Sequence, residues 1–454
     1  MVSLTVVAAS LLVSSMALGQ ALPPSDCTLD QPDKLTCRLS SINSRLERTD
    51  FSVIPNTTVS LNVVCTQADV GSLPPAALSS LIKLNHLSLE GCVLDFLPAG
   101  VFQGLRSLES LRVSTNSPVP LRLEQDSLLH VPLLTSLDLS SSSLRSFPTR
   151  ELCNLPSLTS LNVSNNEIGS IHDLGLSISA DSDCLGRLST LDVSHNELSM
   201  VEADTLLSWP SLSNIDVSNN YIRFVSENVF ANSTRLTKLR MSNNQMSHLP
   251  AILIASLPLM ELHLANNSLS SLPANLFHGH INLEKLDLSG NHLMASGLPN
   301  NLTSDLHNLL SLNLCSNKLA NLSIEMTRPL QNMKELKLCD NKLANIGLSP
   351  TMINLVDLDL SGNELTVLNS KAILPYSQLN YLSLAGNQLS EISSNLFQQT
   401  PNLMVLDLSR NKLDSLPKAL KSLASLQTLD ISENLVRDAD QDALGLLTSL
   451  WRLQ

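Results

Sequence analysis

The stretch Leu283-Glu-Lys-Leu286-Asp-Leu288-Ser-Gly-Asn291-His-Leu293 decides the fold of this chain. Leu stands at its first, fourth and sixth positions, and Asn stands at its ninth. The middle of the stretch predicts a short strand, because Leu286 and Leu288 share one face by the two-residue period while Lys285 and Asp287 share the other. Asn291 comes where this strand ends. Since its amide can donate and accept hydrogen bonds at once, we expect it to satisfy backbone groups left unpaired at the bend.

This pattern recurs along the chain about every 24 residues, a period typical of leucine-rich repeats. The ninth position is occupied by Cys92, Asn116, Ser142, Asn166, Asn196, Asn220, Asn244, Asn267, Asn291, Asn317, Asn341, Asn363, Asn387, Asn411 and Asn434. The repeats predict an α/β solenoid that is curved, with a parallel sheet on its concave face and irregular or short helical convex segments. The four Phe residues that follow a ninth position by ten predict an aromatic row inside the coils: Phe102, Phe230, Phe277 and Phe397.

The repeats also set the domain organisation. Length alone, 454 residues at 43% apolar composition, would suggest about three globular domains. We instead expect a signal peptide at 1–19, an N-terminal cysteine cap at 20–57, about 16 leucine-rich coils at 58–449, and the start of a truncated repeat at 450–454. The net charge of -13 disfavours nucleic acid and anionic membrane surfaces as partners.

The N-terminus predicts entry into the secretory pathway. A mainly apolar run at 4–13 precedes the small-x-small site Ala17-Leu18-Gly19, which indicates a signal peptide, with a buried apolar strand as the alternative. No 18 uninterrupted apolar residues occur, so we expect no membrane span within this chain. N-x-S/T sequons, which an Asn- and Ser-rich repeat also generates by chance, add support at Asn56, Asn162, Asn232, Asn266, Asn301 and Asn321. Asn162 stands at the fifth position of its repeat, where a glycan would project over the concave face.

The eight Cys residues predict four disulfides. Cys27 and Cys37 bracket a short polar segment before the first coil and predict a cap that covers the end of the solenoid. Cys153 and Cys184 occupy nearly the same phase on adjacent coils, and the interval between their coils carries an insertion of about six residues within 172–189, which we expect to form a loop.

The other two pairs also lie one coil apart, but each has an alternative. Cys65 and Cys92 differ in phase by one residue, and Cys92 could instead be a buried substitute for the turn Asn. Cys315 and Cys339 have the same phase on consecutive concave strands, so they either pair or are two exposed thiols.

The sequence contains no motif that points to catalysis. It contains neither H-E-x-x-H nor G-x-S-x-G nor a Gly-rich phosphate loop, so we expect a protein that is not an enzyme and has no cofactor. His278-Gly279-His280 is the nearest approach to a metal-binding pair, but a solvated loop is the favoured interpretation. No CxxC spacing accompanies Cys315 and Cys339.

We therefore expect the binding site to lie on the concave surface. Its fifth positions carry a row of acids at Asp138, Asp192, Asp216, Asp287, Asp359, Asp407 and Asp430. This row predicts either a plain solvated face or a binding surface for a basic partner. A group of cations interrupts it and, together with Asp287, supplies our candidate binding residues: Lys238, Arg240, His263, Lys285 and Lys337.

Several motifs near the N-terminus resemble one known family. They are Cys27, Leu35-Thr36-Cys37-Arg38-Leu39, Ile42-Asn43-Ser44, Phe51-Ser52-Val53-Ile54-Pro55, the Cys65 and Cys92 pair, and Leu161-Asn162-Val163-Ser164. These motifs resemble the ectodomain start of arthropod Toll receptors, of the Tollo and 18-wheeler branch, and the likeness runs along essentially all of the chain after the signal peptide.

The resemblance implies a type I receptor on the plasma membrane. Its ectodomain would bind an extracellular protein, such as a cystine-knot cytokine of the Spätzle type or another cell-surface molecule. It would signal by receptor association through a cytoplasmic TIR domain. The chain lacks the family's remaining repeats, membrane helix and TIR domain, so we expect an N-terminal fragment of such a receptor. The alternative is a secreted, soluble leucine-rich-repeat protein that acts as a matrix component or decoy binder.

Overall fold

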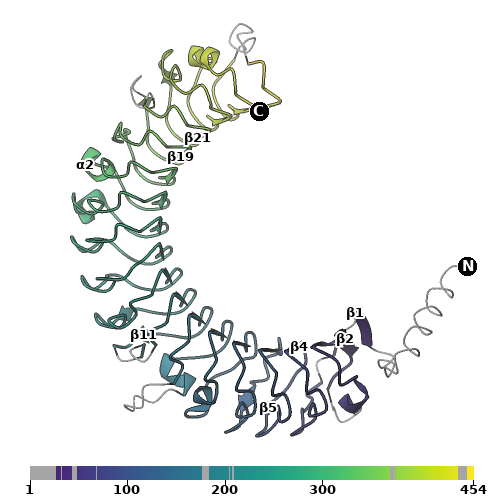
Figure 1. Cartoon of the computed structure of the whole chain (residues 1–454). Helices are drawn as coiled ribbons and strands as arrows, with labels where there is room; N and C mark the ends of the chain where they lie inside the picture. Colours follow the sequence, from purple (N-terminus) through teal and green to yellow (C-terminus); the bar gives the residue numbers. More distant parts are fainter. Residues whose placement is uncertain are drawn as a thin grey trace, which may run out of the picture. The chain divides into compact units, whose positions relative to one another are not determined.

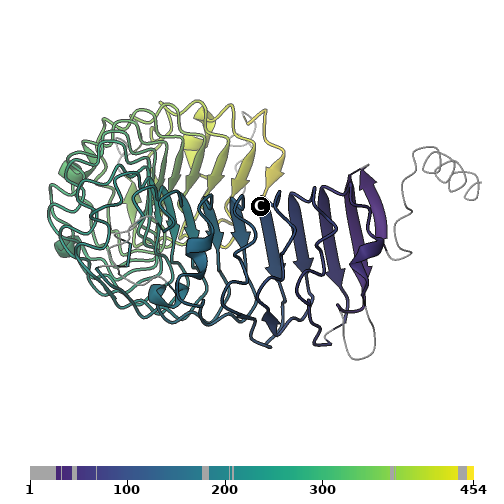
Figure 2. The same cartoon turned by 60° about the horizontal axis from the view of Figure 1, so that its bottom comes forward.

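The computed structural model describes residues 27–454 apart from 32, 43–48, 68, 176–183, 204, 207–208, 369–372, 374 and 438–446. The expected signal peptide at 1–19 and residues 176–183 of the expected insertion loop lie outside the described residues. The chain forms two compact units, unit 1 at 1–220 and unit 2 at 221–454. Each unit is a row of coils that contribute one strand apiece to a parallel sheet (Figures 1 and 2).

Unit 1 begins with an antiparallel pair, β1 and β2, in which Cys27 lies opposite Cys37. Parallel strands follow from β2 onward (Figure 2). The strands of this sheet are β1 Cys27–Gln31, β2 Lys34–Leu39, β3 Ser60–Cys65, β4 His86–Glu90, β6 Ser110–Ser114, β8 Ser136–Asp138, β9 Ser160–Asn162, β10 Thr190–Asp192 and β12 Asn214–Asp216. Outside it lie β5 Phe96–Leu97, β7 Arg122–Leu123, β11 Met200–Val201 and the 3-10 helices η1 Phe51–Val53, η2 Glu151–Asn154 and η3 Ile171–Leu174.

Unit 2 repeats the same coil. Its sheet contains β14 Lys238–Arg240, β15 Glu261–His263, β16 Lys285–Asp287, β17 Ser311–Asn313, β18 Glu335–Lys337, β19 Asp357–Asp359, β21 Tyr381–Ser383, β23 Val405–Asp407, β24 Thr428–Asp430 and β25 Arg452–Leu453. Its other elements are β13 Phe224–Val225, β20 Val367–Leu368, β22 Glu391–Ile392, the short helix α2 Ile324–Thr327 and the 3-10 helices η4 Ala295–Gly297 and η5 Lys418–Ser422. No helix among the described residues has both the length and the apolar character needed to cross a membrane.

The strand leucines stack in register to form the core. Leu286 lies directly beside Leu262 and Leu312 on the neighbouring strands, and all three are at most 3% exposed. The expected aromatic row is also buried, at Phe102, Phe230, Phe277 and Phe397. These observations confirm the leucine-rich-repeat solenoid predicted from the sequence.

The ninth-position Asn joins each coil to the preceding one. The Nδ2 of Asn291 donates to the carbonyl oxygens of Leu288 and, in the preceding coil, Leu264, both at 3.0 Å. Its Oδ1 accepts a hydrogen bond from the backbone N–H of Leu269 at 3.0 Å. Asn291 is 3% exposed. Its amide therefore takes the place of water as the hydrogen-bond partner of buried backbone groups in two coils.

One assignment of the ninth position was wrong. Asn116 is exposed with a φ of 49°, and the preceding Thr115 points inward at 1% exposure. The neighbouring coil explains the change, because Ser142 occupies its ninth position and its Oγ accepts a hydrogen bond from the N–H of Thr115 at 3.3 Å. The same hydroxyl donates to the carbonyl of Val113 at 3.0 Å. The Ser142 hydroxyl thus makes most of the hydrogen bonds that an Asn would make at the ninth position of its coil.

The four disulfides join the cap pair and the three pairs that lie one coil apart, so the alternatives of a buried unpaired Cys92 and of exposed thiols at Cys315 and Cys339 were wrong. The four bonds are Cys27–Cys37, Cys65–Cys92, Cys153–Cys184 and Cys315–Cys339. The Cα atoms of the last three pairs are 4.5 to 4.8 Å apart, as adjacent parallel strands or coils allow. Each of these three therefore ties one coil to the next.

A buried carboxylate forms a further connection between coils. Glu151 is completely buried, and its Oε1 accepts hydrogen bonds from the N–H of Leu128 at 2.6 Å and the hydroxyl of Ser127 at 3.1 Å. Its Oε2 accepts from the N–H of Asp126 at 2.8 Å. Glu151 thus accepts hydrogen bonds from backbone and hydroxyl donors in the convex turn of the preceding coil. The repeat pattern does not reveal this role.

Candidate functional site

The candidate residues from the sequence gather on the concave strands of unit 2. Parallel pairing places Lys238, Glu261 and Lys285 side by side at the third repeat position. The same pairing aligns Arg240, His263 and Asp287 at the fifth. Because side chains two residues apart share one face of a strand, both rows point to the same side of the sheet.

Glu261 is the centre of this group, which we call the Glu261 cluster: Lys238, Arg240, Glu261, His263 and Lys285. The Glu261 carboxylate lies 3.2 Å from Nζ of Lys238, 3.4 Å from the Arg240 guanidinium and 3.6 Å from Nζ of Lys285. Its side chain is only 14% exposed, whereas the three cations are 39% to 54% exposed. The carboxylate therefore forms the floor of the cluster and the cations form its rim.

The electrostatics of Glu261 follow from this arrangement. Burial raises the pKa of Glu261, but the hydrogen bond and charge of Lys238, with the charges of Lys285 and Arg240, outweigh burial and hold it below the ordinary value. Burial and the neighbouring Arg240 lower the pKa of His263, whose Nε2 lies 3.9 Å from the same carboxylate, beyond hydrogen-bond distance. The cluster thus holds an ionised Glu261 among three basic side chains.

Lys337, which we expected to join these cations, has its own acidic partner. Its Nζ lies 2.6 Å from Glu335, which also accepts a hydrogen bond from the hydroxyl of Ser311 at 2.7 Å. The hydrogen bond from Lys337 is the main reason that the pKa of Glu335 is lowered and that of Lys337 is raised. Strand β17 carries no charged residue at these positions, so Lys337 lies apart from the Glu261 cluster.

The cationic patch expected from the sequence is therefore a mixed-charge surface. The acidic row predicted from the sequence contains only fifth-position residues, where the L-D-L pattern recurs, and therefore omits Glu261 and Glu335. Both Glu residues stand at the third position of their repeats. Aligning the third positions of successive coils would have revealed them.

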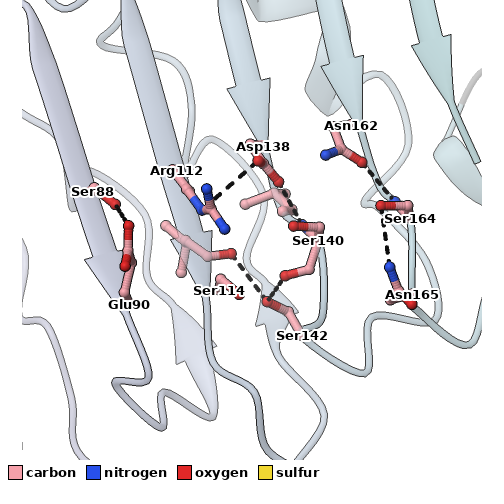
Figure 3. A network of polar contacts seen from close by, with 12 residues as sticks. Ser88, Glu90, Arg112, Ser114, Asp138, Ser140, Ser142, Asn162, Ser164 and Asn165 are labelled. Atoms are coloured by element: carbon pink, nitrogen blue, oxygen red, sulfur yellow. Dashed lines mark hydrogen bonds and ion pairs between the residues drawn. The ribbon is translucent and has the colours of Figure 1, made fainter. Parts of the chain in front are cut away.

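The acidic row at the fifth position has a structural role. Asp287 accepts a hydrogen bond on Oδ1 from the backbone N–H of Ser289, two residues on, at 3.0 Å. Figure 3 shows the equivalent bonds from Ser140 to Asp138 and from Ser164 to Asn162 in unit 1. The same bond recurs at the other fifth-position acids, Asp192, Asp216, Asp359, Asp407 and Asp430. These side chains therefore stabilise the ends of the strands that carry them.

The Cys315–Cys339 disulfide lies on the same concave surface. Cys315 is only 7% exposed, and its Sγ accepts a hydrogen bond from the N–H of Cys339 at 3.1 Å. The two sulfurs and an oxygen of Asp359 lie within 4.8 Å of one another. Since the sulfurs are bonded to each other, they are not the thiolates that a metal ion would require.

The histidines of the convex loop separate instead of forming a pair. His278 lies 2.9 Å from Asp305, which also accepts the N–H of Gly279 at 2.7 Å. His280 turns inward, is 3% exposed and packs edge-on against Phe277 with ring centres 6.5 Å apart. Burial is the main reason that the pKa of His280 lies below its ordinary value.

The sequons differ in their surroundings. Asn162 lies on strand β9, where its Oδ1 accepts the N–H of Ser164. Asn266 is exposed, but its Nδ2 donates to Asn243 at 2.9 Å. The remaining sequon residues are exposed and lie outside the strands, at Asn56, Asn232, Asn301 and Asn321. Within the described sequons, Asn162 alone would place a glycan on a concave strand.

Comparisons with known proteins agree with this architecture. The leucine-rich-repeat family model matches residues 120–168, 186–246, 377–436 and 401–454, and a second model of the same repeat matches 282–305. The chain is 36% identical over 152 residues to Toll-like receptor 7 of Drosophila melanogaster, which covers 31% of this chain and 10% of that protein. The matched stretch therefore spans only a small part of that relative.

Solved structures share the fold. A leucine-rich-repeat protein of Leptospira interrogans superposes with a TM-score of 0.70 at 26% identity, covering 84% of this chain and 92% of that one. A chain of the Drosophila Toll–Spatzle complex superposes with a TM-score of 0.76 at 21% identity, covering 94% of this chain and 61% of that one. The chain is thus a leucine-rich-repeat solenoid that resembles Toll-like receptor ectodomains. The fold is typical of recognition proteins that are not enzymes, and the disulfides and the Toll likeness indicate a secretory or extracellular compartment.

Proposed function

We propose that this chain is the extracellular ligand-recognition region of a Toll-type transmembrane receptor and that it binds a protein without catalysing a reaction. The observation that carries the proposal is the Glu261 cluster on the concave face of unit 2. The likeness to Drosophila Toll-like receptor 7 supports the receptor class. The Tollo and 18-wheeler branch, suggested by the cap and the cysteine spacing, is the part of that class we favour.

The geometry of the cluster suits recognition of an acidic group. Glu261 holds Lys238, Arg240 and Lys285 in place, so a partner would not have to order three flexible side chains. Each of these cations has donors to spare, because a Lys ammonium has three N–H groups and an Arg guanidinium five. A carboxylate of the partner could therefore bind across the rim, while Glu261 below would repel a misplaced one. Such mixed charges favour specificity over raw affinity.

The partner class follows from the resemblance. Toll is in complex with Spatzle in one of the structures that share this fold. By that likeness, we propose a cystine-knot cytokine of the Spätzle type, or another cell-surface protein, as the ligand of a receptor in innate immunity or development. The full receptor would then lie in the plasma membrane with this chain on its extracellular face.

Charge reversal tests the assignment. We expect Lys238→Glu with Arg240→Glu to weaken binding of a recombinant Spätzle-type cytokine at least about tenfold in surface plasmon resonance, because two like-charge contacts replace two attractive ones. Arg328→Glu is the matched control, since Arg328 lies on the convex side after helix α2 and is 60% exposed. Equal affinities for the double variant and the control would exclude the Glu261 cluster from the binding site.

The coding sequence beyond Gln454 tests the receptor class. A membrane-spanning segment followed by a TIR domain is the expected result. A stop codon directly after Gln454 would instead identify a secreted, soluble matrix or decoy binder, for which the same concave surface would serve.

A further inference from the structure

The Cys315–Cys339 disulfide stands at a repeat position that does not need one. Both cysteines occupy the seventh position of their coils. From residue 140 onward, the other coils fill this position with Ser or Ala: Ser140, Ser164, Ser194, Ser218, Ser242, Ala265, Ser289, Ser361, Ala385, Ser409 and Ser432. These coils stack without a covalent bond at the seventh position, so the repeat itself does not explain the cysteine pair.

Backbone hydrogen bonds hold the two coils together independently of the sulfurs. The N–H of Leu314 donates to the carbonyl oxygen of Lys337, and the N–H of Ser316 donates to that of Cys339, both at 2.8 Å. These bonds lie on either side of Cys315, whose Cα is 4.5 Å from that of Cys339. The two side chains would therefore remain adjacent if the bond between their sulfurs were opened.

Asp359 brings a carboxylate to the same place from the next coil. It lies beside Lys337 in the parallel pairing of β18 with β19. A carboxylate oxygen of Asp359 and the sulfurs of Cys315 and Cys339 all lie within 4.8 Å of one another. The Asp359 Oδ1 accepts hydrogen bonds from the N–H of Ser361 at 2.9 Å and from its hydroxyl at 2.6 Å, which fix the orientation of the carboxylate. Three ligand atoms thus converge from three consecutive coils.

The charges around these three atoms favour a cation. Glu335 and Asp357 lie side by side on β18 and β19. Burial, and then the charge of Glu335, raise the pKa of Asp357, and its Oδ1 is buried without a hydrogen-bond partner among the described residues. Lys337, on the same strand as Glu335, is already held by that carboxylate at 2.6 Å. A divalent cation would therefore offset negative charge that the neighbouring side chains leave uncompensated.

We propose that reduction of the Cys315–Cys339 disulfide creates a binding site for a divalent cation of the Zn²⁺ class. The ligands are the two sulfurs and the carboxylate of Asp359, with water in the fourth position, a donor set that suits tetrahedral Zn²⁺. Zn–S bonds of about 2.3 Å place two sulfurs roughly 3.7 Å apart, a separation that adjacent parallel strands allow. This site is separate from the Glu261 cluster and does not depend on it.

The reduction requires a dithiol as co-reactant. A thiolate of the dithiol attacks Sγ of Cys339, the half-buried member of the pair, and the Sγ–Sγ bond breaks with its electron pair on the more buried Cys315. The N–H of Cys339 already donates to Sγ of Cys315 at 3.1 Å, so it stabilises the charge on this leaving sulfur. The second thiol of the dithiol then releases Cys339. Two electrons and two protons pass to the cysteines, the dithiol becomes a disulfide, and metal binding displaces the two thiol protons to solvent.

Cobalt binding tests the site, because thiolate-bound Co²⁺ has a charge-transfer absorbance that hydrated Co²⁺ lacks. The chain is treated with a limiting amount of dithiothreitol, the reductant is removed under argon, and Co²⁺ is titrated. Differential alkylation with peptide mapping identifies the opened disulfide. We expect Cys315 and Cys339 to open first and one Co²⁺ to bind per chain, displaceable by Zn²⁺. Earlier opening of another disulfide, or no thiolate band at about 100 μM Co²⁺, would overturn the proposal.

A matched pair of variants tests the carboxylate. Asp359→Asn removes the charged ligand but keeps an acceptor for the Ser361 N–H, as Asn313 does for the N–H of Cys315 at 3.1 Å. It should weaken Co²⁺ binding at least about tenfold. Asp407→Asn makes the same change two coils further on and should leave binding unchanged. Equal affinities for the two variants would exclude Asp359 as a ligand and overturn the proposed site.

Two cysteine variants separate the geometry from the reduction. Cys339→His removes the disulfide and leaves a thiolate, an imidazole and a carboxylate, so it should bind Co²⁺ without reductant. The double variant Cys315→Ser with Cys339→Ser should bind none even after reduction, and a thiolate band in that variant would overturn the proposal. Lys238→Glu with Arg240→Glu should leave Co²⁺ binding intact, so loss of cytokine binding and loss of metal binding are distinguished.

Discussion

Replacement of Asn291 by Ala tests how the repeat is held together. The change removes the Oδ1 acceptor of the Leu269 N–H and the Nδ2 donor to the carbonyls of Leu264 and Leu288, three bonds of 3.0 Å each. All three backbone groups belong to the buried interior of two adjacent coils. Ala fills less space than Asn, so the deleted amide cannot be replaced by another protein group without movement of the turn.

The magnitude follows from the number of groups left without a partner. An unsatisfied buried donor or acceptor costs about 1 to 3 kcal/mol, and some of these groups will regain water or bend toward another partner. We therefore expect a total loss of about 3 to 5 kcal/mol in local stability, which is large for a single substitution. Asn291→Ser should lose about half as much, because Ser142 makes three comparable bonds at the same repeat position, to Val113, Ser140 and Thr115.

Native-state hydrogen exchange is the appropriate assay. In a solenoid each coil contacts its neighbours, so the damage is local and a global unfolding curve would blur it. Exchange of the Leu269 amide should accelerate in Asn291→Ala, while amides several coils away keep their protection. Asn275→Ala is the control, because Asn275 is exposed and its side chain makes no hydrogen bond among the described residues. Equal protection of Leu269 in the two variants would refute the role assigned to the ninth-position Asn.

Three further predictions rest on other features. Glu151→Ala should lower the free energy of unfolding by about 3 to 5 kcal/mol, because the N–H groups of Asp126 and Leu128 lose a buried acceptor, and an unchanged melting temperature would contradict this. Because the folded pKa of His280 is lowered, its contribution to stability is full above the unfolded value of about 6.5 and is lost as the pH falls from that value through the lower folded pKa. His280→Leu should flatten the decline in unfolding free energy below pH 6.5, whereas curves parallel to wild type would exclude His280 as the cause. Glycopeptide mapping of secreted protein should find a glycan on Asn162, and Asn162→Gln should expose strand β9 to a protein ligand. Asn162 without a glycan would contradict the prediction that a glycan screens this part of the concave face.

The sequence was sufficient for the features that depend on phase within one coil. The period of about 24 residues predicted the strands, the stacked leucines and the proximity of cysteines such as Cys315 and Cys339, because residues at equal phase on adjacent coils are neighbours. Most ninth-position Asn residues could be placed for the same reason. Asn116 was the exception, since the Ser142 of the following coil changes which residue points inward.

Features that depend on side-chain reach between coils were harder to predict. Glu261 pairs with cations on both neighbouring strands, a geometry that requires the lateral register and not the repeat spacing alone. Glu151 reaches the preceding convex turn from the first residue of helix η2, which follows a left-handed residue, Arg150, at a φ of 63°. No local sequence pattern predicts the left-handed residue Arg150, so the hydrogen-bond donors of Glu151 could not be identified from the sequence.

The hydrogen bond that a fifth-position Asp accepts from the N–H two residues on limits which substitutions the concave face tolerates. A substitution at Asp287 or Asp359 alters the surface, but it also removes the acceptor that ends the strand. The third position has no such obligation in any coil, and the fifth position is released from it in the coils that carry Arg240, His263 and Lys337 there. Along unit 2 the third position reads Lys238, Glu261, Lys285, Ser311 and Glu335. Ligand preference in related chains should therefore diverge at the third position in every coil, while the fifth position stays fixed in coils where it carries an acid such as Asp287 or Asp359.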